Sequence, residues 1–483
     1  MFKRLFGRTA DPKLFVIGLD CAPPELLFQQ WRHELPNLKR LMDRGQYREL
    51  ESVIPAITVP AWSCMTSSKD PGTLGFYGFR NRADYSYDGR YIATGQAVKE
   101  KRIWEILSEA GKKCIVVGVP QTYPIKPLAN GHIISSFLTP STTDPAIQWT
   151  HPPELRQEVE KLLAPEIYDV DVPNFRTDDK DYLLRQLYDM TRKRFVVLRH
   201  LLDTRPWDFF MFVEMGTDRI HHALWALHDP THRKFEVNGR YQHAIRDYYR
   251  YLDGEIGTLL ERLPPETHIL TVSDHGVKKM EGGICINEWM RQQGYLSLME
   301  EPPTDRLTTL EQTAVDWPRT RAWGDGGYYA RIFLNLEGRE PQGTVPQAEY
   351  EAFRDELAAA IQAIPAPDGS PLQTRIFKPE EIYRKVRHVA PDLIVYFDDL
   401  GWRSVGSFGH EGIYTFENDT GPDDANHAQF GVWIYTPPAN EAGLDGRQLP
   451  PAHLLDFAPT VLHLFGLPVP ADMQGQVRVG KSA

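Results

Sequence analysis

The chain is poor in three features that would place it in a class at once: paired cysteines, long apolar runs and excess basic charge. Its four cysteines show no paired spacing and lie in or beside apolar segments, which favours reduced, buried thiols: Cys21, Cys64, Cys114 and Cys285. No stretch approaches the roughly 20 apolar residues of a transmembrane helix. The net charge of −11 argues against a general nucleic-acid binder, so no nucleic-acid-binding surface is expected.

The N-terminus predicts a cytoplasmic location. Residues 1–8 are basic and apolar, but Asp11-Pro12-Lys13 interrupts them and a strand-like run follows at once, which leaves no room for a cleaved signal. The alternative is that this short segment touches a membrane surface. The sequence indicates no oligomeric state.

Strand-like and helix-like stretches alternate along the chain, which predicts an α/β fold with a mainly parallel central sheet flanked by helices. The expected strands are residues 14–19, 113–119, 132–136, 208–213, 267–272, 330–336, 393–397 and 430–435. The expected helices are residues 101–110, 182–202, 241–262, 348–364 and 453–464. We expect one domain over residues 1–483, in which residues 138–177 and 278–426 are insertions that form a lid or substrate pocket.

Acidic residues and histidines recur where the predicted strands end. Asp20 follows the first strand, Asp218 and His222 follow another, Asp274-His275 follow a third, and His427 comes late in the chain. Ligands of open α/β sheets bind beyond the carboxyl ends of the strands, so these side chains are expected to converge. Mixed carboxylate and imidazole ligands suit Zn²⁺ first, with Mn²⁺ or Fe as alternatives, rather than Ca²⁺. Taken singly, each motif could instead be a solvated or capping pair.

A threonine segment supplies a candidate nucleophile. Residues 53–57 are strand-like, and Thr58-Val59-Pro60 then starts a predicted helix. A hydroxyl at a helix start lies in a positive field, and a metal ion on its oxygen would lower its pKa. The alternative is that Thr58 only caps the helix. Cys21 and Cys64 lie near these segments but are interpreted as ordinary small apolar residues.

The order and spacing of Asp20, Thr58, Asp218…His222, Asp274-His275 and His427 resemble the alkaline phosphatase superfamily, most closely its type I phosphodiesterase/nucleotide pyrophosphatase branch. The resemblance covers nearly the whole chain, including the C-terminal helix and the Met473-Gln474-Gly475 turn. It implies an alkaline-phosphatase-like core with inserted lid segments.

The resemblance also implies two divalent metal ions. One would be held by Asp218, His222 and His427, and the other by Asp20, Asp274 and His275 beside Thr58. The chain departs from the eukaryotic pattern at Ala61, where an Asn would bind a phosphoryl oxygen. A prokaryotic subgroup, described as phosphohydrolases or phosphomutases, is more similar.

We therefore expect a two-metal phosphoryl hydrolase that uses Thr58 as nucleophile, through a phospho-enzyme intermediate, on a small-molecule phosphate ester. Diesters or pyrophosphate bonds are favoured because only Lys69 lies near Thr58 in sequence, whereas Arg219 could shift the preference to monoesters. The alternatives are a phosphomonoesterase or phosphomutase, then a sulfatase, which would need Cys or Ser in place of Thr58, or a non-catalytic binding protein.

Three parts of the second insertion have more than one possible role. The Gly-aromatic segment 323–329 could line a pocket or form a plain hairpin loop. His410 is the substitute ligand if His427 is not one. Asp423 and Asp424 could orient a ligand residue or form only a solvated turn, and the solvated turn is favoured.

Overall fold

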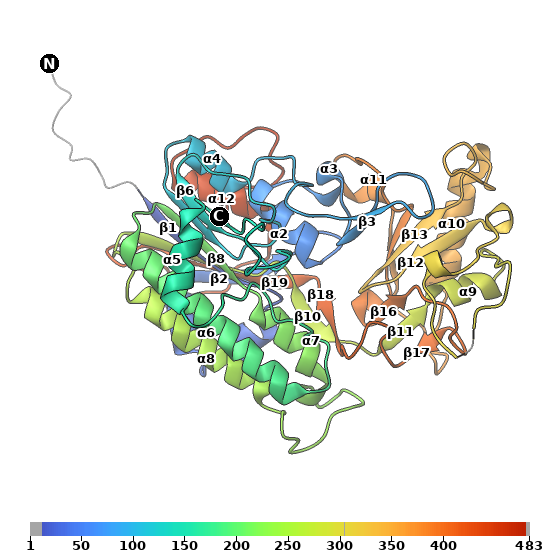
Figure 1. Cartoon of the computed structure of the whole chain (residues 1–483), viewed down its shortest axis with the longest axis horizontal. Coiled ribbons are helices and arrows are strands. Elements are labelled where there is room, and N and C mark those ends of the chain that lie inside the picture. Colours follow the sequence, from blue (N-terminus) through green and yellow to red (C-terminus); the bar gives the residue numbers. More distant parts are fainter. Residues whose placement is uncertain (1–11, 304, 480–483) are drawn as a thin grey trace.

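The computed structural model describes residues 12–303 and 305–479; the basic and apolar start, residues 1–8, lies outside them. A mixed α/β architecture is observed, with a nine-stranded sheet in the order β20-β2-β19-β9-β1-β8-β5-β6-β7 (Figure 1). Its strands are β1 (Lys13–Leu19), β2 (Gln46–Glu51), β5 (Cys114–Val117), β6 (Gly131–Ile134), β7 (Thr150–His151), β8 (Phe209–Glu214), β9 (Thr267–Val272), β19 (Phe430–Thr436) and β20 (Ala452–His453).

The centre of the sheet is parallel, as the sequence predicted. β1 pairs in parallel with both β8 and β9, and β5 pairs in parallel with β8 and β6. β19 is antiparallel to β9 and β2, and β7 is antiparallel to β6. The carboxyl ends of β1, β8 and β9 therefore meet at one edge, where the Asp and His clusters follow.

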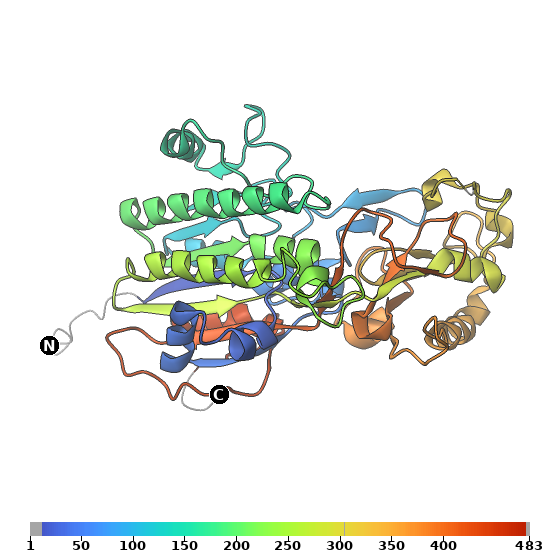
Figure 2. The same cartoon turned by 90° about the horizontal axis from the view of Figure 1, so that it is seen from below.

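Helices cover both faces because the apolar side chains of β1 alternate between two cores. Phe15, Ile17 and Leu19 pack with helices on one face, and Leu14 and Val16 pack with helices on the other. Figure 2 looks onto the first of these faces, with its helices in front of the strands. On the first face lie α1 (Pro36–Arg44), α5 (Glu154–Leu163), α6 (Lys180–Thr204), α7 (Gly216–His228) and α8 (Ala244–Leu260). On the second lie α2 (Thr58–Ser67), α4 (Ile103–Glu109) and α12 (Phe457–Leu464).

A second lobe with its own apolar core stands beside the large sheet (Figure 1). Its four-stranded sheet has the order β12-β13-β15-β14. The lobe contains β11 (Gly282–Cys285), α9 (Ile286–Gln292), β12 (Ala322–Asp325), β13 (Ala330–Leu334), α10 (Tyr350–Gln362), β14 (Arg375–Phe377), α11 (Pro379–Ile382), β15 (Leu393–Tyr396), β16 (Trp402–Val405) and β17 (Tyr414–Thr415).

Short elements join the two lobes. A hairpin of β3 (Arg80–Arg82) and β4 (Arg90–Ile92), preceded by α3 (Pro71–Leu74), reaches the second lobe from the N-terminal part of the chain. β10 (Gly276–Lys279) pairs with β18 (Ala425–Ala428), so the segments that enter and leave the insertion run side by side. This pairing brings His427 next to the end of β9.

The expected helices and strands are confirmed, with differences at their ends, but the strand-like run at residues 53–57 is irregular and forms no strand. The helix expected at residues 453–464 begins only at Phe457, because a strand residue and a 3-10 turn precede it. The sequence analysis missed β2 because Gln46, Arg48 and Glu49 interrupt its apolar pattern; it pairs with β19 toward one edge of the sheet. Among the described residues, no helix is long and apolar enough to cross a membrane.

Candidate functional site

Asp20 is held rigidly at the carboxyl end of β1. Its carboxylate is fully buried and accepts a hydrogen bond of 2.7 Å from the indole N–H of Trp62. The Thr217 hydroxyl donates to the Asp20 carbonyl at 2.5 Å. At Gly18, a Cβ would lie 2.7 Å from Val213 Cγ2, so glycine allows β1 and β8 to approach closely. The hydrogen bonds from Trp62 and Thr217 therefore fix Asp20 in its buried position.

Thr58 is the first residue of α2 and does not cap it. Ile57 is the N-cap, and no side chain caps this helix, so the capping interpretation of Thr58 is wrong. The Thr58 hydroxyl instead lies 3.4 Å from Asp20 Oδ1 and 3.3 Å from His275 Nε2. His275 Nε2 is also 3.2 Å from Asp274 Oδ2. The hydroxyl of Thr58 thus belongs to a cluster with Asp20, Asp274 and His275, at the positive end of a helix.

Asp218, His222 and His427 form a neighbouring cluster. Asp218 and His222 lie one turn apart on α7, and their Oδ1 and Nε2 atoms are 3.2 Å apart. His222 Nε2 is 3.2 Å from His427 Nε2, and the His427 ring stacks on His275 with centroids 4.0 Å apart. The structure therefore brings all the predicted ligand residues together in two adjacent groups, which meet where His427 stacks on His275.

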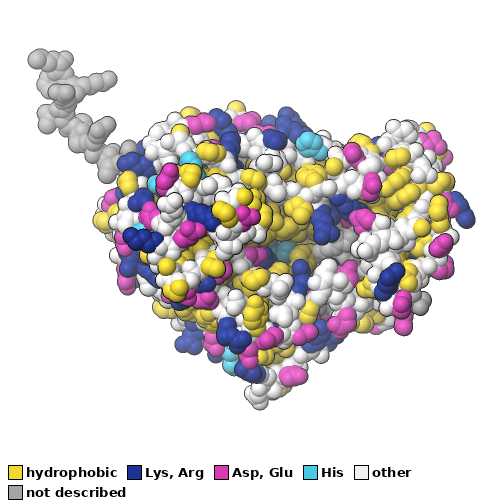
Figure 3. Space-filling view, in the orientation of Figure 1, with side chains coloured by type: hydrophobic (Ala, Val, Ile, Leu, Met, Phe, Trp, Pro, Cys, Tyr) yellow, Lys and Arg dark blue, Asp and Glu magenta, His cyan; other side chains and the backbone are white. Residues whose placement is uncertain are grey.

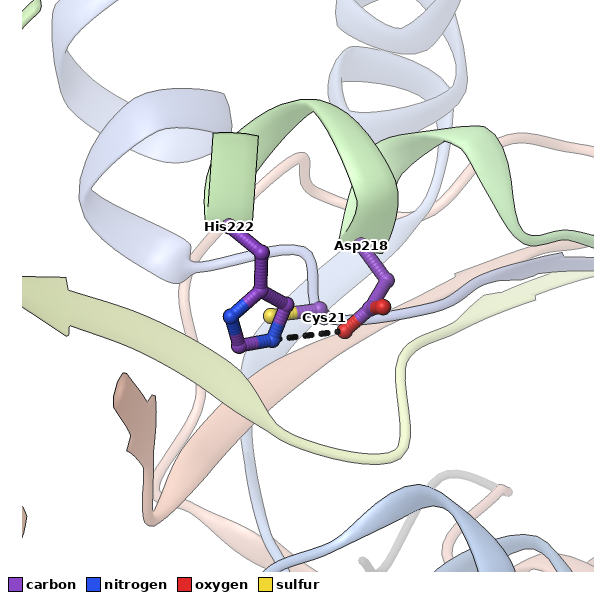
Figure 4. A group of neighbouring side chains, drawn as sticks. All are labelled: Cys21, Asp218 and His222. Carbon is purple, nitrogen blue, oxygen red and sulfur yellow. Dashed lines mark ion pairs between the residues drawn. The ribbon is translucent and has the colours of Figure 1, made fainter. Parts of the chain in front are cut away.

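Cys21 lies below the second group. Its thiol approaches Asp218 and His222 from the turn after β1 (Figure 4), and donates to the Gly276 carbonyl at 3.4 Å. All four cysteines are free and buried, as predicted. Cys64 lies on α2 and packs in the apolar core of the second face.

Asp423 is a site residue that the sequence analysis misassigned. It was interpreted as part of a solvated turn, but its side chain is fully buried and its Oδ1 lies 2.8 Å from His222 Nδ1. The Tyr328 hydroxyl and the Arg176 Nε also donate to it, at 2.7 and 3.1 Å. Asp424 is partly exposed and pairs with Lys234 at 2.9 Å. Asp423 thus orients His222, whereas its neighbour lies at the surface.

The remaining histidine nitrogens are also oriented. His427 Nδ1 lies 2.9 Å from the Ala56 carbonyl and His275 Nδ1 lies 3.0 Å from the Gly276 carbonyl. Hydrogen bonds from Nδ1 to these carbonyls leave Nε2 of both rings as the free acceptor nitrogen. This is the tautomer that a metal ligand needs.

Burial and mutual charge shift the pKa values of the site in opposite directions. Burial raises the pKa of the Asp20 and Asp274 carboxyls well above the usual value, and nearby carboxylates add to it. Burial lowers the pKa of His275 and His427. Burial disfavours the charged form of His222 as well, but Asp423 and Asp218 outweigh it and raise its pKa to about 9. Crowded acidic groups of this kind are typical of a site built for cations.

The donor set fits metal ions. Asp218 Oδ1 and Asp274 Oδ2 are buried and accept no hydrogen bond among the described residues, although His222 Nε2 and His275 Nε2 each lie 3.2 Å from one of them. A buried carboxylate oxygen without a partner is costly unless a cation or water completes its environment. Carboxylate oxygens and imidazole nitrogens that could bind one ion lie within 4.8 Å of one another in two groups: Asp20, Asp274, His275 and Asp218, His275, His427.

The Gly-aromatic segment lines a cavity next to these groups, and it is also the hairpin loop between β12 and β13. The cavity has a volume of about 460 Å³, and its wall includes Ile57, which precedes Thr58. The Tyr328 ring stacks on His222 with centroids 4.9 Å apart. Figure 3 shows the surface hollowed between the two lobes, with Lys and Arg side chains along the hollow.

Three other candidate residues, Lys69, Arg219 and His410, have hydrogen-bond partners of their own. Lys69 is buried and donates to the Asp472 carbonyl. Arg219 forms two hydrogen bonds with Asp171 and one of 2.7 Å with Asp218. His410 Nε2 lies 3.0 Å from the Ser407 hydroxyl, so His427, rather than His410, faces the two acidic groups.

Comparisons with known proteins agree with this geometry. The model of the type I phosphodiesterase/nucleotide pyrophosphatase family matches residues 14–423. Two similar solved structures are the murine and human ectonucleotide pyrophosphatase/phosphodiesterase 5, with 13% and 12% identity and a TM-score of 0.56 each. In both cases the match covers 96% of this chain and 97% of the other. A search of curated proteins gives no match. With 410 of 483 residues matched by the family model, the chain belongs to the type I phosphodiesterase/nucleotide pyrophosphatase family, within the alkaline phosphatase superfamily.

Proposed function

We propose that the chain is a two-metal phosphodiesterase or nucleotide pyrophosphatase in which Thr58 is the nucleophile and forms a phospho-enzyme intermediate. The observation that carries the proposal is the position of the Thr58 hydroxyl, 3.4 Å from Asp20 Oδ1 and 3.3 Å from His275 Nε2, at the start of a buried helix. Among the described residues, the Thr58 hydroxyl makes no helix-capping hydrogen bond, and its polar neighbours are Asp20 and His275.

Two ligand sets are proposed. Asp20, Thr58, Asp274 and His275 would hold one ion, and Asp218, His222 and His427 would hold the other. Mixed oxygen and nitrogen donors favour Zn²⁺, with Mn²⁺ or Fe as alternatives. When bound, the ions would supply Lewis-acid activation of the hydroxyl and neutralise charge on the phosphoryl oxygens.

The proposed mechanism is a double displacement. The Thr58 oxygen attacks phosphorus in line and gives up its proton, a P–O bond forms, and the leaving oxygen departs with its electron pair and takes up a proton. Water then attacks the same phosphorus and gives up a proton, and the departing Thr58 oxygen is protonated again. Trp62 and Thr217 hold Asp20 in place, and Asp423 holds His222, so the site needs little reorganisation between the two steps.

Phosphodiesters and pyrophosphate bonds fit the site better than monoesters. A monoester brings an additional negative charge, but Lys69 pairs with Asp472, and Arg219 uses all three of its guanidinium nitrogens on Asp171 and Asp218. Ala61 is buried in α2 and offers no oxyanion donor. A monoesterase or phosphomutase is therefore the second candidate, and a sulfatase lacks its required residue at Thr58.

A solved relative supports a nucleotide-related substrate. A variant of the murine ectonucleotide pyrophosphatase/phosphodiesterase 5 in which a threonine is replaced by alanine is described as inactive and in complex with AMP. We propose that Thr58 corresponds in role to that threonine. We further propose that residues 278–426 form the substrate-covering part of a single catalytic domain and that residues 138–177 extend it.

Two variants of Thr58 test the nucleophile. Thr58→Ala should lower the hydrolysis of a nitrophenyl phosphodiester by at least about a thousandfold, since it removes the attacking oxygen. Thr58→Ser should retain measurable activity. Because Thr58 makes no cap hydrogen bond, both variants should melt close to the wild type. An Ala variant that keeps its activity would refute the proposal.

Metal analysis tests the two ligand sets. The purified protein should contain close to two equivalents of metal, and a chelator should abolish hydrolysis that Zn²⁺ or Mn²⁺ restores. Asp274→Asn and His427→Ala should each lose about one equivalent, from different sites. Full activity in a metal-free sample would contradict the two-metal assignment.

A further inference from the structure

The cavity beside Thr58 is more basic than the chain that forms it. Five arginines line it, Arg80, Arg90, Arg176, Arg331 and Arg403, against three carboxylates, Glu311, Asp325 and Asp419. The whole chain has a net charge of −11. The lining of this cavity therefore carries a net positive charge in an acidic chain, and the concave surface focuses its field.

Carboxylates orient most of these guanidinium groups without covering them. Asp325 accepts from Arg90 at 2.7 Å and pairs with Arg331 at 3.2 Å. Asp419 pairs with Arg403 at 3.2 Å. Arginine has five N–H donors, so each of these contacts leaves donors for a second acceptor. Such fixed guanidinium groups are suited to planar or tetrahedral anions.

Arg80 differs from the other four arginines that line the cavity. It begins β3, its side chain is exposed, and among the described residues its guanidinium has no ion pair or hydrogen bond. Its backbone carbonyl accepts from Arg331, which anchors it to the lobe. A free cation at the rim of a basic cavity is placed to receive a ligand.

The cavity lies next to the proposed reacting centre. Ile57 lines it and is adjacent to Thr58, and Tyr328 lines it while its hydroxyl lies 3.3 Å from His222 Nδ1. Arg176 reaches from the cavity wall to the Tyr328 hydroxyl at 2.8 Å. The volume of about 460 Å³ is within the usual range of small-molecule sites, about 300–1,000 Å³. A group attached to a phosphorus atom at Thr58 can therefore extend into it.

We propose that this arginine-lined cavity binds a second anionic group of the substrate, a phosphate or carboxylate carried by the part of the molecule beyond the reacting phosphorus. The inference rests on the proposed function for the position of that phosphorus, and it narrows the substrate class to phosphodiesters or pyrophosphates with an additional negative charge. Arg80 is the residue that determines the preference for an anionic substrate, since no carboxylate of the described residues pairs with its guanidinium.

Three matched nitrophenyl phosphodiesters test the inference. Their second ester group is a short alkyl chain that ends in a methyl, a carboxylate or a phosphonate group, so the leaving group is constant. The wild type should prefer at least one anionic ester to the methyl ester by about tenfold or more in kcat/KM, mainly through a lower KM. The carboxylate and phosphonate esters distinguish the two anion types.

Variants connect the preference to the cavity. Arg80→Gln should remove most of the preference, measured as the ratio of kcat/KM for the anionic esters to that for the methyl ester within the same variant. Arg185→Gln is the matched control, because Arg185 is also exposed but lies on α6 away from the cavity. Glu311→Gln should increase the preference, since it removes a partly exposed carboxylate that pairs with Arg90. Added salt should weaken the preference in the wild type.

The outcomes separate this inference from the proposed function. Equal kcat/KM for all three esters would overturn the inference and leave the hydrolase assignment intact. Binding without turnover is measured by calorimetry with propylphosphonate and propane-1,3-bisphosphonate, and the bisphosphonate should bind about tenfold more tightly to the wild type than to Arg80→Gln. That result in a protein that hydrolyses none of the esters would support the cavity and refute the proposed function. Equal bisphosphonate affinity in wild type and Arg80→Gln would refute the cavity assignment.

Discussion

Replacement of Asp423 by asparagine should weaken metal binding although Asp423 is not one of the proposed ligands. Its carboxylate holds His222 Nδ1 at 2.8 Å, and is itself fixed by Tyr328 and Arg176. Burial disfavours ionisation of Asp423, but His222 and Arg176 outweigh it and lower its pKa to about 2. The group is therefore a carboxylate at neutral pH, and asparagine removes its charge with little change in size.

The expected magnitude follows from the role of such partners. Loss of a group that orients a histidine ligand typically lowers metal affinity about 10- to 100-fold, or about 1.4–2.7 kcal/mol. One of the two proposed ions should be affected, because Asp423 contacts His222 and does not contact Asp20, Asp274 or His275 among the described residues. The assay is competition between the protein and a chelator of known affinity, with metal content measured after equilibration.

Asp424→Asn is the matched control. It removes the same charge from the adjacent residue, but Asp424 is partly exposed and pairs with Lys234, so the expected effect on affinity is less than about twofold. The melting temperature of each metal-free variant shows whether the fold is retained. If Asp423→Asn binds both metal equivalents as tightly as the wild type, or if Asp424→Asn loses as much, Asp423 does not act through His222.

Two further predictions concern protons and packing. Because the pKa of His222 is raised to about 9 in the metal-free protein, its ring is protonated at neutral pH and must release a proton to bind a metal; the affinity should rise from pH 7 to 9, and calorimetry in two buffers of different ionisation enthalpy should detect proton release. A pH-independent affinity would contradict this assignment. Gly18→Ala should lower the free energy of unfolding by about 1–3 kcal/mol because its Cβ would lie 2.9 Å from the Phe212 carbonyl oxygen, whereas Gly254→Ala, with no atom within 4 Å on α8, should gain up to about 1 kcal/mol. Denaturant unfolding of both variants measures the difference, and similar effects at the two glycines would refute the packing argument.

The strands and most proposed ligands could be predicted from sequence because their signals are local. Apolar runs that end in Asp20 or Asp274 mark both a strand and its functional end, and the four-residue spacing of Asp218 and His222 marks one helix face. The position of Thr58 was also predicted, although its lack of a capping role was visible only in the structure.

The parts that were not predicted depend on contacts between distant segments. Asp423 lies 201 positions from His222, and a Pro-Asp-Asp turn has the composition of an exposed loop. It is buried because β10 and β18 bring its segment against α7. The arginines of the cavity come from four separate segments, one of which is the β3–β4 hairpin, and none of these segments has a basic run, so no local pattern indicates a basic surface.

The stereochemical course at phosphorus tests the central claim most directly. A phosphodiester made chiral at phosphorus with sulfur and an oxygen isotope is hydrolysed, and the configuration of the product is determined. Attack by Thr58 followed by attack of water inverts phosphorus twice, so the proposed double displacement predicts net retention. Net inversion would show a single attack by water and would contradict the assignment of Thr58 as the nucleophile.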